Sequence, residues 1–175
     1  ICVLAGIVVL TTAGADTLYG GTSDDTYWFV TAATTVIEES DQGSDTVVLA
    51  FTQTGATPLL IDMATRYAHV ETLSLAYSTG RFTVIGTDDA ETLSSNPYAS
   101  RLEGRGGDDY LIGGGNRDTL TGGLGDDYYA IASASEVIVE AAGEGFDRVL
   151  FSGTNDTATA ITLSYSQVEQ IEVSG

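Results

Sequence analysis

The sequence is poor in basic residues, proline, cysteine and histidine. Six Lys and Arg stand against 25 Asp and Glu, and the formal net charge is −19. A charge of this sign repels nucleic acid phosphates and anionic membrane surfaces, so we expect no nucleic acid partner and no membrane insertion. The lone cysteine, Cys2, cannot form an intrachain disulfide, and the single histidine, His69, excludes a site built from several histidines of this chain.

Long hydrophobic runs and catalytic motifs are also lacking. The opening segment ICVLAGIVVL, residues 1–10, is too short for a transmembrane helix and has no basic start of a signal peptide. Its Val, Ile and Leu content predicts a buried β-strand. The sequence contains neither an HExxH zinc motif nor a nucleophile-elbow pattern, so we expect that the chain is not an enzyme.

Hydrophobic residues and glycine are abundant in this acidic chain. Hydrophobic residues make up 43% of the sequence, which favours a packed body over disorder. There are 21 glycines but only two prolines, a ratio that indicates repeated turns rather than a flexible linker. Because crowded carboxylates repel one another in a compact fold, the excess of acids calls for a cation, and a divalent metal is the simplest candidate.

The clearest repeat is a run of three nine-residue blocks: GRGGDDYLI from Gly104, GGGNRDTLT from Gly113 and GGLGDDYYA from Gly122. Each block has Asp at its sixth position and an apolar or aromatic residue at its eighth. The sixth positions are Asp109, Asp118 and Asp127, and the eighth are Leu111, Leu120 and Tyr129. A period of nine residues with glycine turns predicts short strands, each joined to the next by a tight turn.

The same frame continues upstream and recurs near the start of the chain. The blocks from Gly86 and Ser95 keep an apolar eighth residue but carry Glu91 and Ser100 at the sixth position, so we expect them to bind metal poorly. Two earlier blocks, TTAGADTLY from Thr11 and GGTSDDTYW from Gly20, place Asp16 and Asp25 sixth. The nonapeptides therefore form two tracts, residues 11–28 and 86–130.

A larger repeat relates the two tracts. The pairs Asp16 and Asp118, Asp25 and Asp127, Glu38 and Glu140, and Asp45 and Asp147 are each separated by 102 residues. We therefore expect two units, residues 1–79 and 80–175, each a glycine-rich roll followed by a strand-rich segment, joined in one continuous solenoid. The acids outside the nonapeptides have two open interpretations, a solvated strand edge or calcium ligation.

The chemistry of the blocks favours calcium. Each sixth-position Asp offers a hard anionic oxygen at a turn where glycines expose backbone carbonyls, and calcium takes six to eight oxygen ligands of these kinds. The candidate metal-ligating residues are Asp16, Asp25, Asp109, Asp118 and Asp127 with glycines Gly104, Gly107, Gly113, Gly122 and Gly125, and, outside the nonapeptides, Asp45 and Asp147.

The nonapeptides resemble the RTX, or hemolysin-type, repeats, whose pattern GGxGxDxUx is met fully by residues 122–130. The resemblance implies an all-β fold, a parallel β-roll or β-solenoid, in which two nonapeptides make one coil and Ca²⁺ is shared between turns on the same side. Asp109 and Asp127 are then expected to share a site, whereas Asp118 belongs to the other side. The family is typically secreted by bacteria and folds on meeting external calcium, which implies an extracellular or cell-surface location.

Three functions are compatible with these features. The first is a calcium-rigidified structural repeat of a bacterial adhesin, surface layer or self-assembling fibre, with Ca²⁺ and neighbouring repeats or further copies as its partners. The start of the chain, IVVLTTAGADTL, resembles residues 82–93, and this likeness suggests either a longer tandem array or head-to-tail self-association of separate copies. The second is a calcium-dependent secretion and folding appendage of an enzyme. The third, a sugar-binding or ice-binding face, requires regular outward ladders of Thr or aromatic residues.

Overall fold

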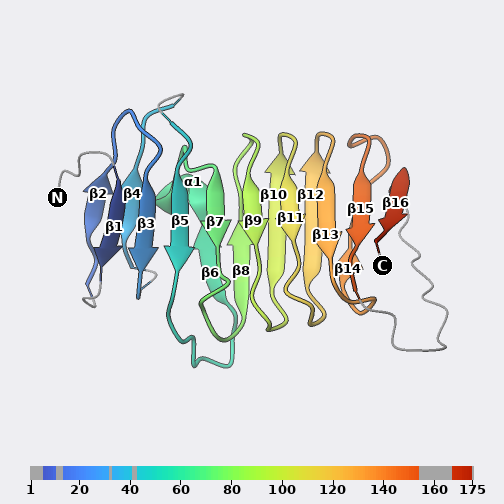
Figure 1. The fold of residues 1–175 in the computed structure, drawn as a ribbon, viewed down its shortest axis with the longest axis horizontal. Coiled ribbons are helices and arrows are strands. Elements are labelled where there is room, and N and C mark those ends of the chain that lie inside the picture. The colour runs from blue at the N-terminus through green and yellow to red at the C-terminus, as the bar shows by residue number, and fades with distance from the viewer. Residues whose placement is uncertain (1–5, 11–13, 32, 41–42, 154–166, 175) are drawn as a thin grey trace.

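The computed structural model is all-β apart from one short helix among the residues it describes, which are 6–10, 14–31, 33–40, 43–153 and 167–174. Its strands lie side by side along the long axis of the molecule, and the chain advances along this axis from the N-terminal to the C-terminal end (Figure 1). Every pair of neighbouring strands in the described residues runs parallel. The fold is a parallel β-solenoid, as the sequence predicts.

One long sheet contains the odd-numbered strands and, at one end, β16. Its strands, in spatial order, are β1 (Ile7–Leu10), β3 (Thr26–Phe29), β5 (Thr46–Leu49), β7 (Thr72–Ser74), β9 (Thr92–Ser94), β11 (Tyr110–Ile112), β13 (Tyr128–Ile131), β15 (Arg148–Phe151) and β16 (Gln170–Val173). We call this the nine-stranded sheet.

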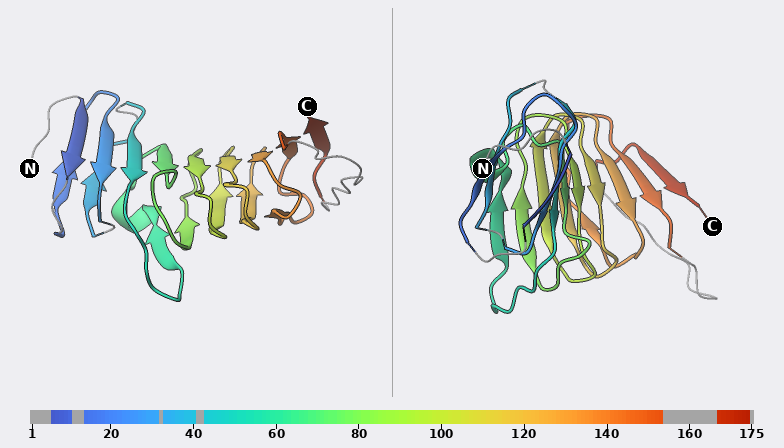
Figure 2. Two further views of the ribbon diagram at one scale, coloured as in Figure 1. Left: turned by 60° about the horizontal axis from the view of Figure 1, so that its bottom comes forward. Right: turned by 60° about the vertical axis from the view of Figure 1, so that its left-hand side comes forward.

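The opposite face of the solenoid is made by the even-numbered strands in two pieces. The longer piece contains β6 (Leu59–Asp62), β8 (Phe82–Ile85), β10 (Arg101–Gly106), β12 (Thr119–Leu124) and β14 (Val137–Ile138). The shorter piece pairs β2 (Thr17–Tyr19) with β4 (Thr35–Ile37). The two faces lie opposite each other as layers along the molecule (Figure 2).

The nonapeptide explains this coil directly. In both tracts a strand begins immediately after the sixth residue of each block, and two blocks complete one turn, so equivalent residues such as Asp109 and Asp127 lie 18 residues apart. The eighth residue points inward in every block and is fully buried: Leu18, Tyr27, Leu93, Leu102, Leu111, Leu120 and Tyr129. Burial of one large apolar side chain per strand gives the narrow solenoid a continuous core.

One coil is longer than the others and interrupts the even-numbered face. The Asp45 amide and the Glu71 carboxylate, which are bonded between adjacent coils, lie 26 residues apart in sequence. The extra length contains helix α1 (Met63–Arg66), whose Met63 is buried together with the following Tyr67. The nonapeptide frame gives no signal for this insertion.

The predicted strand in the opening segment is confirmed by β1, whereas residues 1–5 lie outside the described part of the chain. The likeness between the opening segment and residues 82–93 does not extend to their places in the fold. Strand β1 belongs to the nine-stranded sheet, but β8 belongs to the opposite face. Within the described residues, no helix has the length and apolar character needed to cross a membrane.

Candidate metal centre

The turns that lead into the nine-stranded sheet carry a row of carboxylates on one edge of the solenoid. From β3 onward, an acidic residue stands directly before each strand of this sheet. These residues, which we call the acidic edge, are Asp25, Asp45, Glu71, Glu91, Asp109, Asp127, Asp147 and Glu169. Because equivalent turns of a solenoid stack, the acids form a row rather than scattered surface charges.

Hydrogen bonds tie the acidic edge together from coil to coil. The amide of Asp109 donates to Oδ1 of Asp127 over 2.8 Å, and the amide of Asp127 donates to Oδ1 of Asp147 over 3.0 Å. The same bond joins the Asp25 amide to Oδ1 of Asp45 over 2.8 Å. Each of these carboxylates therefore uses one oxygen to hold the preceding coil and keeps the other for a different partner.

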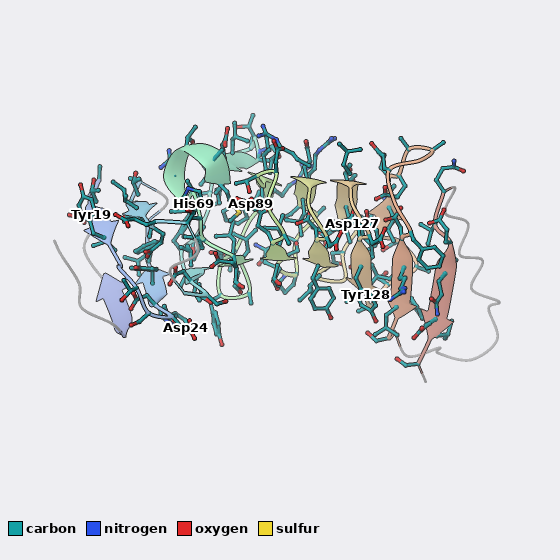
Figure 3. All side chains as sticks on the ribbon, turned by 90° about the horizontal axis from the view of Figure 1, so that it is seen from above. Tyr19, Asp24, His69, Asp89, Asp127 and Tyr128 are labelled. Atoms are coloured by element: carbon teal, nitrogen blue, oxygen red, sulfur yellow. The ribbon has the colours of Figure 1, made fainter. Side chains whose placement is uncertain are left out.

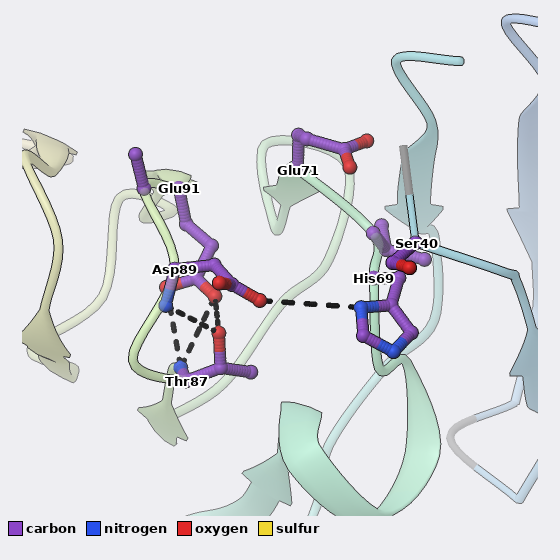
Figure 4. A pocket seen from close by; sticks show the side chains of 8 residues that line it. Ser40, His69, Glu71, Thr87, Asp89 and Glu91 are labelled. Carbon is purple, nitrogen blue, oxygen red and sulfur yellow. Dashed lines mark hydrogen bonds and ion pairs between the residues drawn. The ribbon is translucent and has the colours of Figure 1, made fainter. Parts of the chain in front are cut away.

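The row is interrupted beside the longer coil. The Glu91 carboxylate accepts hydrogen bonds from the amide and hydroxyl of Thr87 in its own turn. A cavity of about 310 Å³ lies between Glu71 and Glu91, and His69 and Asp89 face each other across it at 4.0 Å (Figure 4). The longer coil thus separates the acidic edge into two stretches.

Each stretch contains a cluster of three buried acids. In the first, carboxylate oxygens of Asp25, Glu38 and Asp45 all lie within 4.8 Å of one another. The second cluster, Asp127, Glu140 and Asp147, has the same spacing. We call these the first and second triads. Figure 3 shows Asp24, beside the first triad, toward the N-terminal end and Asp127 of the second toward the C-terminal end.

A core tyrosine accompanies each triad. The Tyr27 hydroxyl donates to Oε1 of Glu38. In the second triad the Tyr129 hydroxyl accepts a 2.6 Å bond from the Gly122 amide, which also donates to Oε1 of Glu140 over 3.1 Å. Burial, followed by the neighbouring Glu38, raises the pKa of Tyr27, so this hydroxyl stays protonated and remains a donor.

Several buried oxygens of the acidic edge and the triads have no hydrogen-bond partner among the described residues. They are Oδ2 of Asp25, Oδ2 of Asp109, Oδ2 of Asp127 and Oε2 of Glu140. An unpaired buried carboxylate oxygen is costly, and native proteins satisfy nearly all such atoms. Hard anionic oxygens converging in a buried turn are the donor set that Ca²⁺ takes, so these residues fit a calcium ion.

Glycines make room for the carboxylates. A Cβ on Gly104 would collide with Oδ2 of Asp109, and one on Gly122 would collide with Oδ2 of Asp127. Glycine is therefore needed at these two positions because a side chain would not fit, and not because the backbone conformation excludes other residues. Gly107 and Gly125 fit the expected turn role, because their φ angles of +90° and +129° are ones that L side chains rarely adopt.

Burial and crowding raise the pKa values of Asp45, Asp109 and Asp127 on the acidic edge and of Glu140 in the second triad. Burial raises the pKa of Asp109 to about 8, with Glu91 and Asp127 adding to the effect. Burial raises the pKa of Asp127 to about 7 and that of Glu140 to about 8, and Asp147 contributes to both. Asp45 is raised to about 6, again mainly by burial. A bound cation would favour the charged form of all four groups.

These shifts predict that the calcium-free fold becomes less stable as pH rises. The folded chain keeps protons on Asp109, Asp127 and Glu140 up to about pH 7 to 8, whereas the unfolded chain releases them near pH 4. The folded state binds more protons across this window, so its stability falls with increasing pH. In EDTA we expect a higher melting temperature at pH 5 than at pH 8, and saturating calcium should reverse the order. A melting temperature in EDTA that increases with pH would contradict this account.

The opposite edge of the solenoid is differently built. Asp118 is fully buried, but its Oδ1 accepts from the Ser100 amide and its Oδ2 from the Gly114 amide, both over 2.7 Å. Glu136 receives the amides of Gly115 and Ala132. Asp16 is half-buried. The sixth-position acids of the two edges therefore differ in their hydrogen bonding, although the sequence pattern treats them alike.

The nonapeptide frame missed Glu38 and Glu140, because both lie beyond the last nonapeptide of their tract. Glu38 and Glu140, like Asp45 and Asp147, are separated by 102 residues. This recurrence is the sequence feature that could have identified them as site residues. The interpretation of these four acids as a solvated strand edge is wrong, because none is more than 9% exposed. Each Glu instead lies against the acids of neighbouring turns.

The fold is a parallel β-solenoid, and its clusters of buried acids are compatible with metal binding. Comparison with known families agrees: the RTX calcium-binding nonapeptide repeat, in four copies, matches residues 8–29, 85–120 and 94–129. These segments of the chain are RTX calcium-binding nonapeptide repeats, and Ca²⁺ is their cofactor. No curated protein and no solved structure matches the chain.

Proposed function

We propose that this chain is an extracellular structural repeat segment whose solenoid is made rigid by calcium along the acidic edge. The observation that carries the proposal is the pair of triads, in which buried carboxylate oxygens lack any other partner among the described residues. The ligands we assign are Asp25, Asp45, Asp109, Asp127 and Asp147, joined by Glu38 and Glu140. Repeats of this family occur in secreted bacterial proteins, where calcium concentrations suit weak sites.

We assign Asp118 to holding adjacent turns together rather than to metal binding. Both of its carboxylate oxygens already accept backbone hydrogen bonds. A carboxylate satisfied in this way gains less from a cation than one with a free buried oxygen. Calcium would then stiffen one edge of the solenoid, and direct hydrogen bonds would hold the other.

The ends of the nine-stranded sheet support a role in an array, such as an adhesin, a surface layer or a fibre. Strands β1 and β16 are the outer strands of this sheet. On β16, Ile171 is 41% and Val173 is 66% exposed, and an uncovered apolar strand readily pairs with another strand. A further coil of the same kind, from a neighbouring repeat or a second copy, would cover it and extend the acidic edge.

Calorimetric titration of calcium into the EDTA-treated chain, with sedimentation velocity on the same samples, tests this function. We expect saturable binding with dissociation constants on the order of 10⁻⁴ to 10⁻³ M, typical of extracellular calcium modules. We also expect larger species to form as calcium is added. Magnesium at the same ionic strength is the control, because its smaller octahedral shell suits these turns poorly.

Two results would count against the proposal, each on a different part. If the chain does not bind calcium, the proposal that the metal stiffens the solenoid is wrong. If the chain binds calcium but stays monomeric at high concentration, the calcium-stiffened solenoid is supported and assembly between separate copies is ruled out.

A further inference from the structure

A shallow pocket lies beside the second triad, where the acidic edge meets the outer face of the nine-stranded sheet. Its volume is about 260 Å³. The residues that line it are Asp108, Asp126, Asp127, Tyr128, Phe146 and Arg148. Of these residues only Asp127 belongs to the metal centre, so calcium binding does not explain why the other side chains gather here.

Aromatic rings form one wall of the pocket. Tyr128 meets Tyr110 of the neighbouring strand edge to face, with ring centroids 5.1 Å apart. The Phe146 ring is covered by the Arg148 guanidinium, whose carbon lies 5.3 Å from the ring centroid. Tyr110 is 37% and Phe146 is 44% exposed, so these rings face solvent instead of the core. Figure 3 shows Tyr128 pointing away from the solenoid.

Hydrogen-bonding groups form the other wall. Asp108 accepts the Asp126 amide over 2.9 Å, and Asp126 accepts the Phe146 amide over 2.8 Å, each through Oδ1. Both residues are exposed, so the second oxygen of each carboxylate is available to a ligand. The pocket thus combines flat apolar surfaces with carboxylate acceptors and a guanidinium donor.

The first triad provides an internal comparison, because it keeps the metal ligands without this pocket's lining. Asp24 accepts the Ser44 amide over 2.8 Å, just as Asp126 accepts that of Phe146. At the 102-residue offset, however, Tyr128, Phe146 and Arg148 are replaced by Thr26, Ser44 and Thr46. The solenoid and its triad therefore form without the aromatic and guanidinium groups, which points to a separate role for them.

We propose that this pocket, bounded by Tyr128, Phe146 and Arg148, binds one unit of a neutral glycan. A sugar ring presents a face of C–H groups that packs on aromatic rings, and its hydroxyls can donate to Asp108 and Asp126 and accept from Arg148. The net charge of −19 disfavours an anionic ligand. The guanidinium already over Phe146 disfavours a cationic one. The volume lies just below the range of roughly 300 to 1,000 Å³ of drug-sized pockets and suits a single sugar unit.

The test uses the full chain in saturating calcium and a panel of maltohexaose, cellohexaose, chitohexaose and mannohexaose. Saturation-transfer NMR should detect contact between at least one of these sugars and the protein. The triple variant Tyr128→Thr, Phe146→Ser and Arg148→Thr gives each position the residue of the first copy. We expect it to weaken sugar binding at least tenfold and to leave the calcium isotherm unchanged.

Controls separate failure of the glycan proposal from failure of the proposed function. The pocket rests on that function, because it belongs to the calcium-bound fold. Tyr77→Ser removes an exposed aromatic residue, 64% accessible and tilted against Trp28, from another part of the surface and should leave sugar binding intact. If the triple variant loses calcium, the single variant Phe146→Ser repeats the comparison. The glycan proposal fails if no sugar of the panel binds, if the variants bind as the parent does, or if tetramethylammonium binds in place of the sugars. None of these outcomes would alter calcium binding by the parent chain.

Discussion

Removing calcium at neutral pH is expected to lower the stability and the melting temperature of this β-fold strongly. Without the cation, each triad places three carboxylates within 4.8 Å of one another in a buried turn, where their repulsion is poorly screened. Some of that repulsion is relieved by protonation, since the pKa values of Asp127 and Glu140 rise to about 7 and 8. This relief fades as the pH approaches 8, so the calcium-free fold is weakest there.

The size of the effect follows from mass action. A ligand present at a hundred times its dissociation constant stabilises the folded state by about 2.7 kcal/mol per site, so two triads contribute about 5 kcal/mol. A domain's whole stability is roughly 5 to 15 kcal/mol, and loss of both sites therefore removes a large share of it. Circular dichroism in calcium, in EDTA and after calcium is restored measures the change. An unchanged spectrum and melting temperature in EDTA would show that the fold does not depend on calcium.

The fold was largely predictable because the nonapeptide fixes both the turn and the direction of one side chain. The eighth-position residues had to be apolar to close the core, and Leu111 and Tyr129 are fully buried as expected. The sixth-position residue of each block directly precedes a strand, so the stacking of Asp109 and Asp127 follows once two blocks make a coil. The helix-containing coil was not predictable, because its 26-residue spacing breaks the frame without leaving a motif.

The candidate site was predictable only in part, because a sequence pattern does not report hydrogen-bond partners. Asp118 and Asp127 occupy the same position of the repeat, yet both oxygens of Asp118 are paired and Oδ2 of Asp127 is not. The difference depends on the turn preceding each residue, which places the Gly114 amide against Asp118. Glu140 had no counterpart in the motif, and only the path of the following coil brings it to Asp127.

This contrast makes Asp127→Asn the most informative substitution. The amide oxygen of Asn can still accept the bond from the Asp109 amide, but the charge and the free Oδ2 are lost. We expect calcium affinity at the second triad to fall about a hundredfold, equivalent to about 2.7 kcal/mol. In EDTA near pH 8 the same change should raise the melting temperature, because it removes a buried carboxylate whose pKa is raised to about 7. The substitution therefore destabilises the calcium-bound chain and stabilises the calcium-free one.

Asp118→Asn is the matched control for the opposite effects that Asp127→Asn is expected to have on stability with and without calcium. Its new NH₂ group would face one of two amide donors, Ser100 or Gly114, so a hydrogen bond is lost whether or not calcium is present. We expect a lower melting temperature in both conditions and no change in the calcium isotherm. Melting curves of the two variants in calcium and in EDTA separate a metal ligand from a structural acid. If Asp127→Asn also lowers the melting temperature in both conditions, Asp127 acts like Asp118 and the second triad is not a calcium site.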